Sequence, residues 1–216
     1  MNKLKKYKIA YSAHSQNYDS PADRRRFLFY AKKRKLNFDY YNPKNKYDIV
    51  ILTGSSDLSI IERLIKEKTI IIFDCTDSYY LQNDNWRDYL RGFAKYASGN
   101  MEDLYFNYGK RLRYVLKKVN GLSCASNEQK IKLLNFNNNV HSISDYFNNE
   151  TIFLKSDYSN DDVFNIAWEG LPSNVYQLNM LKNVFKYFSK THSFILHIIT
   201  DKYNYKYMNK FGKNLT

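Results

Sequence analysis

Several features are scarce or missing in this sequence. Only 2 of its 216 residues are cysteines, and neither Cys75 nor Cys124 has metal-ligand spacing to another Cys or His. Both end predicted strands, so we expect small buried side chains rather than a disulfide or a metal site. No run approaches the ~18 apolar residues of a membrane-spanning helix, and the first residues, MNKLKKYKIAYS, lack a signal-peptide core. We expect a soluble, cytoplasmic protein.

Three catalytic motifs are also missing. There is no phosphate-binding loop ending in Gly-Lys-Ser/Thr, and no G-x-G-x-x-G follows a predicted strand. P-loop nucleotide hydrolysis and ordinary dinucleotide oxidoreduction are therefore disfavoured. G-x-S-x-G is absent as well, which leaves little support for a hydrolase with a serine nucleophile.

The chain does contain short apolar runs that alternate with longer amphipathic stretches. The runs are rich in Ile, Val, Phe and Tyr and are too short for helices, so we interpret them as strands. They are Tyr7–Ser12, Leu36–Tyr41, Asp48–Thr53, Thr69–Asp74, Leu122–Ala125 and Val140–Ile143, followed later by Val163–Gly170 and Ser193–Thr200. Such alternation predicts an α/β fold with a doubly wound, Rossmann-like parallel sheet that helices cover on both faces.

Residues that begin helices support this assignment. Ser20-Pro21-Ala22-Asp23 places a capping hydroxyl before a proline at the first helical position. Ser126 to Gln129 fits a capping box. Ser173 is expected to cap a helix that carries Leu178, Leu181, Phe185 and Phe188.

The net charge of +13 is concentrated near the N-terminus. Residues 1–35 contain 11 Lys or Arg and only two Asp, a net +9. Arg24–Arg26 and Lys32–Lys35 flank an apolar segment of one predicted helix, which suits an anionic membrane surface or a phosphate-bearing substrate. An ordinary solvated helix face explains the same pattern equally well. Nucleic-acid binding is less favoured because no recognised reader motif accompanies the charge.

Polar loops follow the predicted strands, at the edge where open parallel sheets form their binding crevice. The first loop runs from Ser12 to Pro21 and precedes a helix whose N-terminus could hold an anion. His14 in this loop is a candidate general base, although a lone loop histidine is often incidental. The second loop, residues 53–56, combines Gly54 with hydroxyls such as Ser55 and suits phosphate or sugar hydroxyls.

Two further loops carry candidate ligand-binding groups. Asp74 and Asp77 lie three residues apart at a strand end, where they could hydrogen-bond an acceptor or simply cap the next segment. After the strand that ends near Glu169, Gly170 permits close backbone approach. The helix beginning near Ser173 would aim its N–H groups at a ligand.

The order of these pieces resembles a known enzyme family. The segments that carry the resemblance are SPADRRR (20–26), YDIVI (47–51), IIIFD (70–74) with Asp77, VNGLSCAS (119–126), VHSISD (140–145) and IAWEG (166–170). In this order the chain is similar to GT-B fold glycosyltransferases of the family-four-like, nucleotide-sugar-dependent kind. The resemblance covers nearly the whole chain.

The resemblance implies a division into domains. Residues 1–148 would form a Rossmann-like acceptor-binding domain and residues 149–162 a polar linker. Residues 163–216 would begin a Rossmann-like donor-binding domain. Because family members continue well beyond this point, we expect the second domain to be incomplete and the chain to be a fragment, a truncated gene product or part of a two-polypeptide enzyme.

The resemblance also implies a function and a set of site residues. The expected reaction transfers a sugar from a nucleotide sugar to a saccharide or lipid-linked acceptor, without a bound metal or other cofactor, in cell-envelope polysaccharide or glycolipid synthesis. The protein would be cytoplasmic and could be peripheral to the inner face of the membrane. Expected acceptor-side residues are Ser12, His14 as catalytic base, Asp19, Arg24, Gly54, Ser55, Asp74 and Asp77; expected donor-side residues are Glu169, Gly170 and Ser173. The alternative is a non-catalytic module that binds an anionic membrane or polymer through its basic first helix.

Overall fold

The computed structural model describes residues 6–15, 17–81, 86–99, 101–146 and 163–200. The chain divides into two compact units, Met1–Glu150 and Thr151–Thr216. The expected linker at 149–162 and the residues after Thr200 lie outside the described part.

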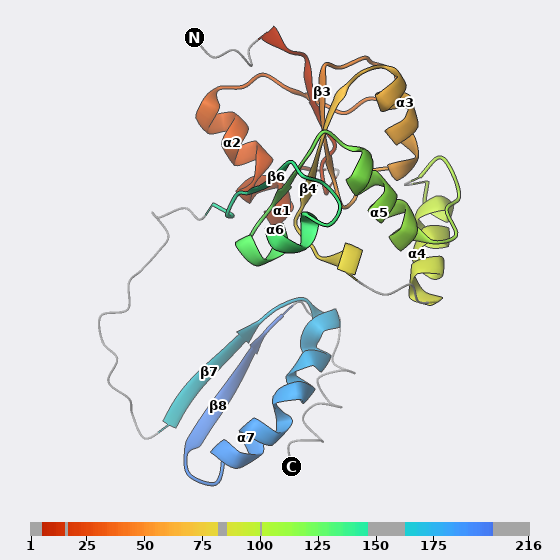
Figure 1. Ribbon diagram of the computed structural model, residues 1–216. Coiled ribbons are helices and arrows are strands. Elements are labelled where there is room, and N and C mark those ends of the chain that lie inside the picture. The colour runs from red at the N-terminus through yellow and green to blue at the C-terminus, as the bar shows by residue number, and fades with distance from the viewer. Residues whose placement is uncertain (1–5, 16, 82–85, 100, 147–162, 201–216) are drawn as a thin grey trace. The chain divides into compact units, whose positions relative to one another are not determined.

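The first unit is built on a six-stranded parallel sheet with the order β2-β1-β3-β4-β5-β6 (Figure 1). The strands are β1 (Ile9–Tyr11), β2 (Asp39–Tyr40), β3 (Ile49–Thr53), β4 (Ile70–Cys75), β5 (Gly121–Cys124) and β6 (Val140–Ser142). Each strand begins and ends inside a predicted run or no more than one residue outside it. The prediction of an α/β, Rossmann-like parallel sheet is confirmed.

One face of this sheet carries the main core. Because side chains alternate along a strand, Val50 and Leu52 of β3 point to this face together with Ile71 and Phe73 of β4, and all four are buried. Helical elements between β3 and β6 contribute to the same core; they are η2 (Leu58–Ile60), α3 (Ile61–Lys66), η3 (Tyr79–Leu81), α5 (Tyr108–Lys118) and α6 (Asn127–Leu133). Helix α4 (Trp86–Ala97) lies against α5. Cys75 and Cys124 are register partners on this face, and both are buried and free, as expected.

The opposite face is covered only in part. A smaller cluster of Ile9, Tyr11, Ile49 and Ile51 packs against Phe27 of the segment that joins β1 to β2. Ile72 of β4 also packs against this cluster, whereas Ile70, two residues earlier on the same strand, is 41% exposed. This face is therefore covered less fully toward β4 than at β1 and β3.

The basic segment after β1 is two helices, not the single helix expected. Helix α1 spans Pro21–Arg25 and α2 spans Phe27–Arg34, because Arg26 adopts φ −120° and ψ −107° between them. The Ser20 hydroxyl accepts a hydrogen bond from Ala22 N at 3.3 Å, which confirms the predicted cap. Arg26 is only 6% exposed, so it does not belong to the basic surface that Arg24–Arg26 were expected to form.

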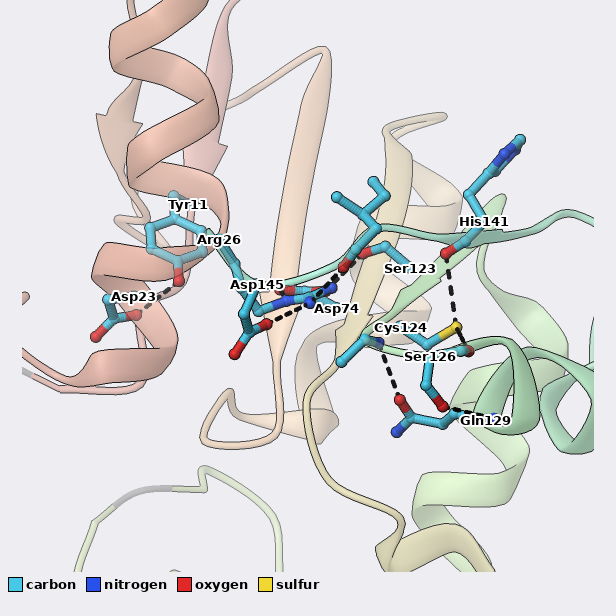
Figure 2. Close-up of polar contacts among 12 residues, drawn as sticks. Tyr11, Asp23, Arg26, Asp74, Ser123, Cys124, Ser126, Gln129, His141 and Asp145 are labelled. Carbon is cyan, nitrogen blue, oxygen red and sulfur yellow. Dashed lines mark hydrogen bonds and ion pairs between the residues drawn. The ribbon is translucent and has the colours of Figure 1, made fainter. Parts of the chain in front are cut away.

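Arg26 instead forms a buried ion pair across the sheet. Its Nε and Nη2 donate to the two carboxylate oxygens of Asp74 at 2.7 and 2.5 Å. Its Nη1 donates to Asp145 Oδ1 at 2.9 Å and to the Ile143 carbonyl at 2.8 Å, and Ser123 Oγ donates to Asp74 at 2.6 Å (Figure 2). This network ties α2 to β4 and to the segment after β6, and it raises the pKa of Arg26 despite the opposing effect of burial.

The second unit contains a parallel β-helix-β arrangement. Strands β7 (Val163–Glu169) and β8 (Ser193–Ile199) pair in parallel along their whole length, and η5 (Pro172–Leu181) and α7 (Lys182–Phe188) connect them. Val175, Leu178 and Phe185 are buried against the sheet. The cap expected at Ser173 is wrong: the helical segment begins at Pro172, and Leu171 precedes it without a side-chain cap.

Candidate functional site

A polar pocket of about 340 Å³ lies at the carboxyl ends of β1, β2 and β3. This is the edge at which parallel α/β sheets bind ligands. The pocket is lined by Tyr11, Ser12, Ala13, His14, Ser15, Tyr18, Tyr40, Tyr41, Ser55 and Lys95. Hydroxyls, one imidazole and one ammonium group therefore surround it, a lining suited to a small ligand rich in hydroxyl groups.

A buried carboxylate shapes the wall of this pocket. Asp23, fully buried on α1, accepts hydrogen bonds from Tyr11 Oη at 2.6 Å and from the backbone N of His14 at 2.8 Å. The backbone N and the hydroxyl of Ser15 each donate to it at 3.1 Å. The backbone and hydroxyl donors of this loop therefore bind a carboxylate of the chain itself. Burial, reinforced by the bond to Asp23, raises the pKa of Tyr11, so this phenol stays protonated.

Asp23 is consequently expected to hold the loop in place. We expect Asp23→Ala to lower the free energy of unfolding by roughly 1–3 kcal/mol, because it leaves the buried Tyr11 hydroxyl and two backbone donors without an acceptor. Asp19→Ala is the matched control, since exposed Asp19 accepts a bond at 3.1 Å from the same Ser15 hydroxyl. Urea denaturation of the two variants measures the difference. Equal losses would show that Asp23 does not organise this loop.

His14 lies where its imidazole can take a proton from a ligand. Its Nδ1 is 3.5 Å from Ser55 Oγ, whereas its Nε2 is buried and has no partner among the described residues. Nδ1 is therefore the nitrogen that a ligand hydroxyl could reach. Burial lowers the pKa of His14 below the ordinary 6.5, although Asp23, Asp74 and Asp77 oppose the shift. A neutral imidazole at physiological pH is the form that acts as a base.

The structure brings together four of the expected acceptor-side residues. Ser12, His14 and Ser55 line the pocket. Gly54 lies beside them, since a Cβ added there would be 3.9 Å from His14 Cε1. The Ser12 hydroxyl accepts a bond at 2.8 Å from Ser56 Oγ, which joins the loops after β1 and β3.

The other expected acceptor-side residues lie outside the pocket. Asp19 is exposed on the loop before α1, and Arg24 is exposed on α1. Asp77 is exposed after β4. Asp74 is 4% exposed, and Arg26 and Ser123 already donate to both of its oxygens. Contacts between these four residues and an acceptor stay predictions.

The expected donor-side residues belong to the second unit. Glu169 is the exposed last residue of β7, and Gly170 follows it. A Cβ on Gly170 would lie 2.7 Å from the Trp168 ring, so packing of this ring gives a structural reason for glycine here. Ser173 lies in η5, and its side chain is outside the described part. A role of these residues in binding a donor stays a prediction.

Several residues of the pocket were not among the site residues predicted from the sequence. Tyr18 and Tyr40 stack with their ring centroids 3.3 Å apart, and Tyr18 adopts φ 59°, a left-handed conformation that is uncommon outside glycine. Lys95 Nζ, from α4, donates to the Gly54 carbonyl and to Tyr108 Oη, each at 3.2 Å. Because the chain has 21 tyrosines, nothing in the sequence distinguishes the two that form this stacked pair. No sequence signal connects Lys95 with Gly54, 41 residues earlier.

Within the described ranges, no group of three or more His, Cys, Asp or Glu residues could hold a metal ion, and no helix there has the length and hydropathy to cross a bilayer. No protein-family model matches the sequence, and no curated protein matches it significantly.

Proposed function

We propose that the first unit is the acceptor-binding domain of a GT-B glycosyltransferase that uses a nucleotide-sugar donor. The observation that carries the proposal is the polar pocket at the carboxyl ends of β1–β3, where His14 lies among hydroxyl groups. The parallel sheet and the order of the sequence segments that resemble this family support it further.

In this proposal the acceptor is a saccharide or a lipid-linked saccharide whose sugar occupies the pocket. Ser12, Ser55 and Tyr41 supply hydroxyls for hydrogen bonds, and the stacked Tyr18 and Tyr40 offer an aromatic edge for a sugar ring. His14 Nδ1 accepts the proton of the attacking acceptor hydroxyl. The hydroxyl oxygen then bonds to the anomeric carbon as the bond from that carbon to the nucleoside diphosphate breaks.

The donor would bind to the second unit. Gly170 and the backbone at the start of η5 follow β7 at its carboxyl end, the kind of position at which α/β folds bind nucleotides. Glu169 and Ser173 flank this turn. The Gly170 N–H already donates to the Ile199 carbonyl at 3.2 Å and Pro172 has no N–H, so the Leu171 N–H would be the donor to the departing diphosphate.

Calorimetric titration of the chain with UDP, GDP and their sugars tests the proposal, together with hydrolysis and transfer assays on the chain and on any longer form that the gene encodes. We expect binding of one nucleotide class that Gly170→Val weakens and Asp19→Ala does not. A full-length protein that neither binds nor turns over any nucleotide sugar would contradict the proposal.

A second candidate function is supported by the surface of α2. Lys32, Lys33, Arg34 and Lys35 are exposed, as are Arg24 and Arg25 on α1. A non-catalytic module that binds an anionic membrane or polymer would use these groups. Sedimentation with phosphatidylglycerol vesicles that is unaffected by Arg24→Glu with Arg25→Glu and by Lys32→Glu with Lys33→Glu would contradict this candidate.

A further inference from the structure

An apolar groove of about 400 Å³ runs along the partly covered face of the sheet, between α2 and strands β3–β6. It is separate from the polar pocket, because the two share no lining residue. We propose that this groove binds the acyl chain of an anionic membrane lipid. The inference does not depend on glycosyl transfer, since it concerns another cavity and is tested without a donor.

Strand register makes the floor of the groove. Ile49 pairs with Ile70, and Ile51 pairs with Ile72, so four isoleucines lie side by side on two neighbouring strands. Ile72 in turn pairs with Gly121 of β5, where the Asn139 side chain lies 2.9 Å from the place that a Cβ would take. The floor is therefore an apolar strip of isoleucines that is bordered by an amide side chain at β5.

The carboxyl end of the groove is closed by the buried ion pair. Arg26, Asp74 and Ser123 line the groove here, and Figure 2 shows how they converge. Because Asp74 and Asp145 both pair with Arg26, this end offers no unpaired charge to a lipid head group. An acyl chain would therefore place its terminal methyl group toward this end and its head group toward the other.

The opposite end combines apolar exposure with positive charge. Tyr30 and Ile70 line the groove and are 42% and 41% exposed. Arg34 lies over the Tyr30 ring with its guanidinium carbon 5.8 Å from the centroid, and Lys32, Lys33 and Lys35 are exposed on the same segment. An aromatic side chain with a basic side chain over its ring, at the mouth of an apolar groove and on a segment of positive charge, is a combination that can bind an anionic head group above a buried chain.

The shape of the groove favours a single acyl chain over a peptide helix. A helix with its side chains is about 10 Å wide, whereas an extended acyl chain is narrow enough to lie along the isoleucine floor. The basic rim also selects an anionic head group, which an apolar peptide does not supply.

Calorimetry with monomeric lysophosphatidylglycerol tests the inference, with lysophosphatidylcholine and glycerol phosphate as the other two ligands. We expect lysophosphatidylglycerol to bind most tightly. Ile70→Gln should weaken its binding roughly tenfold, and Lys32→Glu with Lys33→Glu about fivefold or more. The matched controls are Ile131→Gln on α6, where Ile131 is 64% exposed, and Lys117→Glu with Lys118→Glu on α5. These should bind like the native chain.

A second measurement locates the acyl chain without disturbing the floor. In a Tyr30→Trp variant, a bromine-labelled acyl chain should quench the new indole beyond the quenching seen in the native chain. Equal binding by the groove variants and their controls would overturn the inference. So would equal affinity for glycerol phosphate, or quenching no greater than in the native chain.

Discussion

Replacing Arg26 by methionine should lower the free energy of unfolding by about 3–5 kcal/mol, because it leaves a buried carboxylate without its counter-ion. The side chains of Arg26 and Asp74 are only 3% and 5% exposed, and two direct hydrogen bonds join them. Asp74→Ala should cost a similar amount, since the buried guanidinium then keeps only Asp145 and one carbonyl. Guanidinium chloride denaturation followed by circular dichroism measures both losses.

The double change Arg26→Met with Asp74→Leu distinguishes the cost of an unpaired buried charge from the contribution of the ion pair itself. A buried ion pair replaced on both sides by apolar groups is often neutral or stabilising, so the double variant should be more stable than either single variant. Arg24→Met is the matched control, because Arg24 is exposed two positions earlier. If Arg26→Met were no more destabilising than Arg24→Met, the pair would not hold this part of the fold together.

The strands of the sheet were predictable because each local pattern agrees with the tertiary structure. The short runs rich in Ile and Val form buried parallel strands. Ser20 begins a helix by accepting a hydrogen bond from Ala22, only two residues later in the sequence. The break at Arg26 was not predictable in this way. Its partners lie 48 and 119 residues away in the sequence, so no local spacing distinguishes it from the exposed Arg24 and Arg25.

The alternation of residue types in β5 and β6 indicates the partly covered face of the sheet, but it was not used in predicting the fold. In β5, Gly121 and Ser123 point to this face while Leu122 and Cys124 point to the core, and in β6 His141 is exposed while Val140 is buried. Such alternation is typical of strands that are covered on one side only. The runs are four and three residues long, which is too short for the period to outweigh the overall α/β pattern.

The candidate site was predictable where one rule of topology suffices. Parallel strands align their carboxyl ends, so the loops that contain Ser12, His14 and Ser55 had to meet at one edge. The positions of Asp23 and Lys95 depend instead on side-chain contacts. Asp23 could be read only as a charge at a helix start, whereas the structure uses it as the acceptor for the preceding loop.

The largest effect expected on function concerns His14. If the first unit acts as proposed in a glycosyltransferase, His14→Gln should lower the rate constant of glycosyl transfer by roughly 10²–10⁴-fold, the usual contribution of a general base. Glutamine keeps a polar group near Ser55 but cannot accept a proton at physiological pH. Transfer kinetics on the intact enzyme, with saturating donor and acceptor, measure the change in kcat. His192→Gln is the matched control, because His192 is exposed and lines neither the pocket nor the groove.

The pH dependence gives this assignment an independent test. Burial holds the pKa of His14 below 6.5, so the imidazole is neutral at physiological pH and the rate should not change with pH there. As the pH falls through the lowered pKa, protonation removes the base, and kcat/KM should fall by up to tenfold per pH unit. The same shift makes the fold more stable above pH 6.5 and less stable as the pH falls through that pKa, since the unfolded chain then binds more protons. An NMR titration of the His14 ring should therefore give the same midpoint as the acid limb of the rate profile. A ring that titrates above 6.5, or a rate profile whose acid limb persists in His14→Gln, would remove His14 from the role of base and leave it as a wall of the pocket.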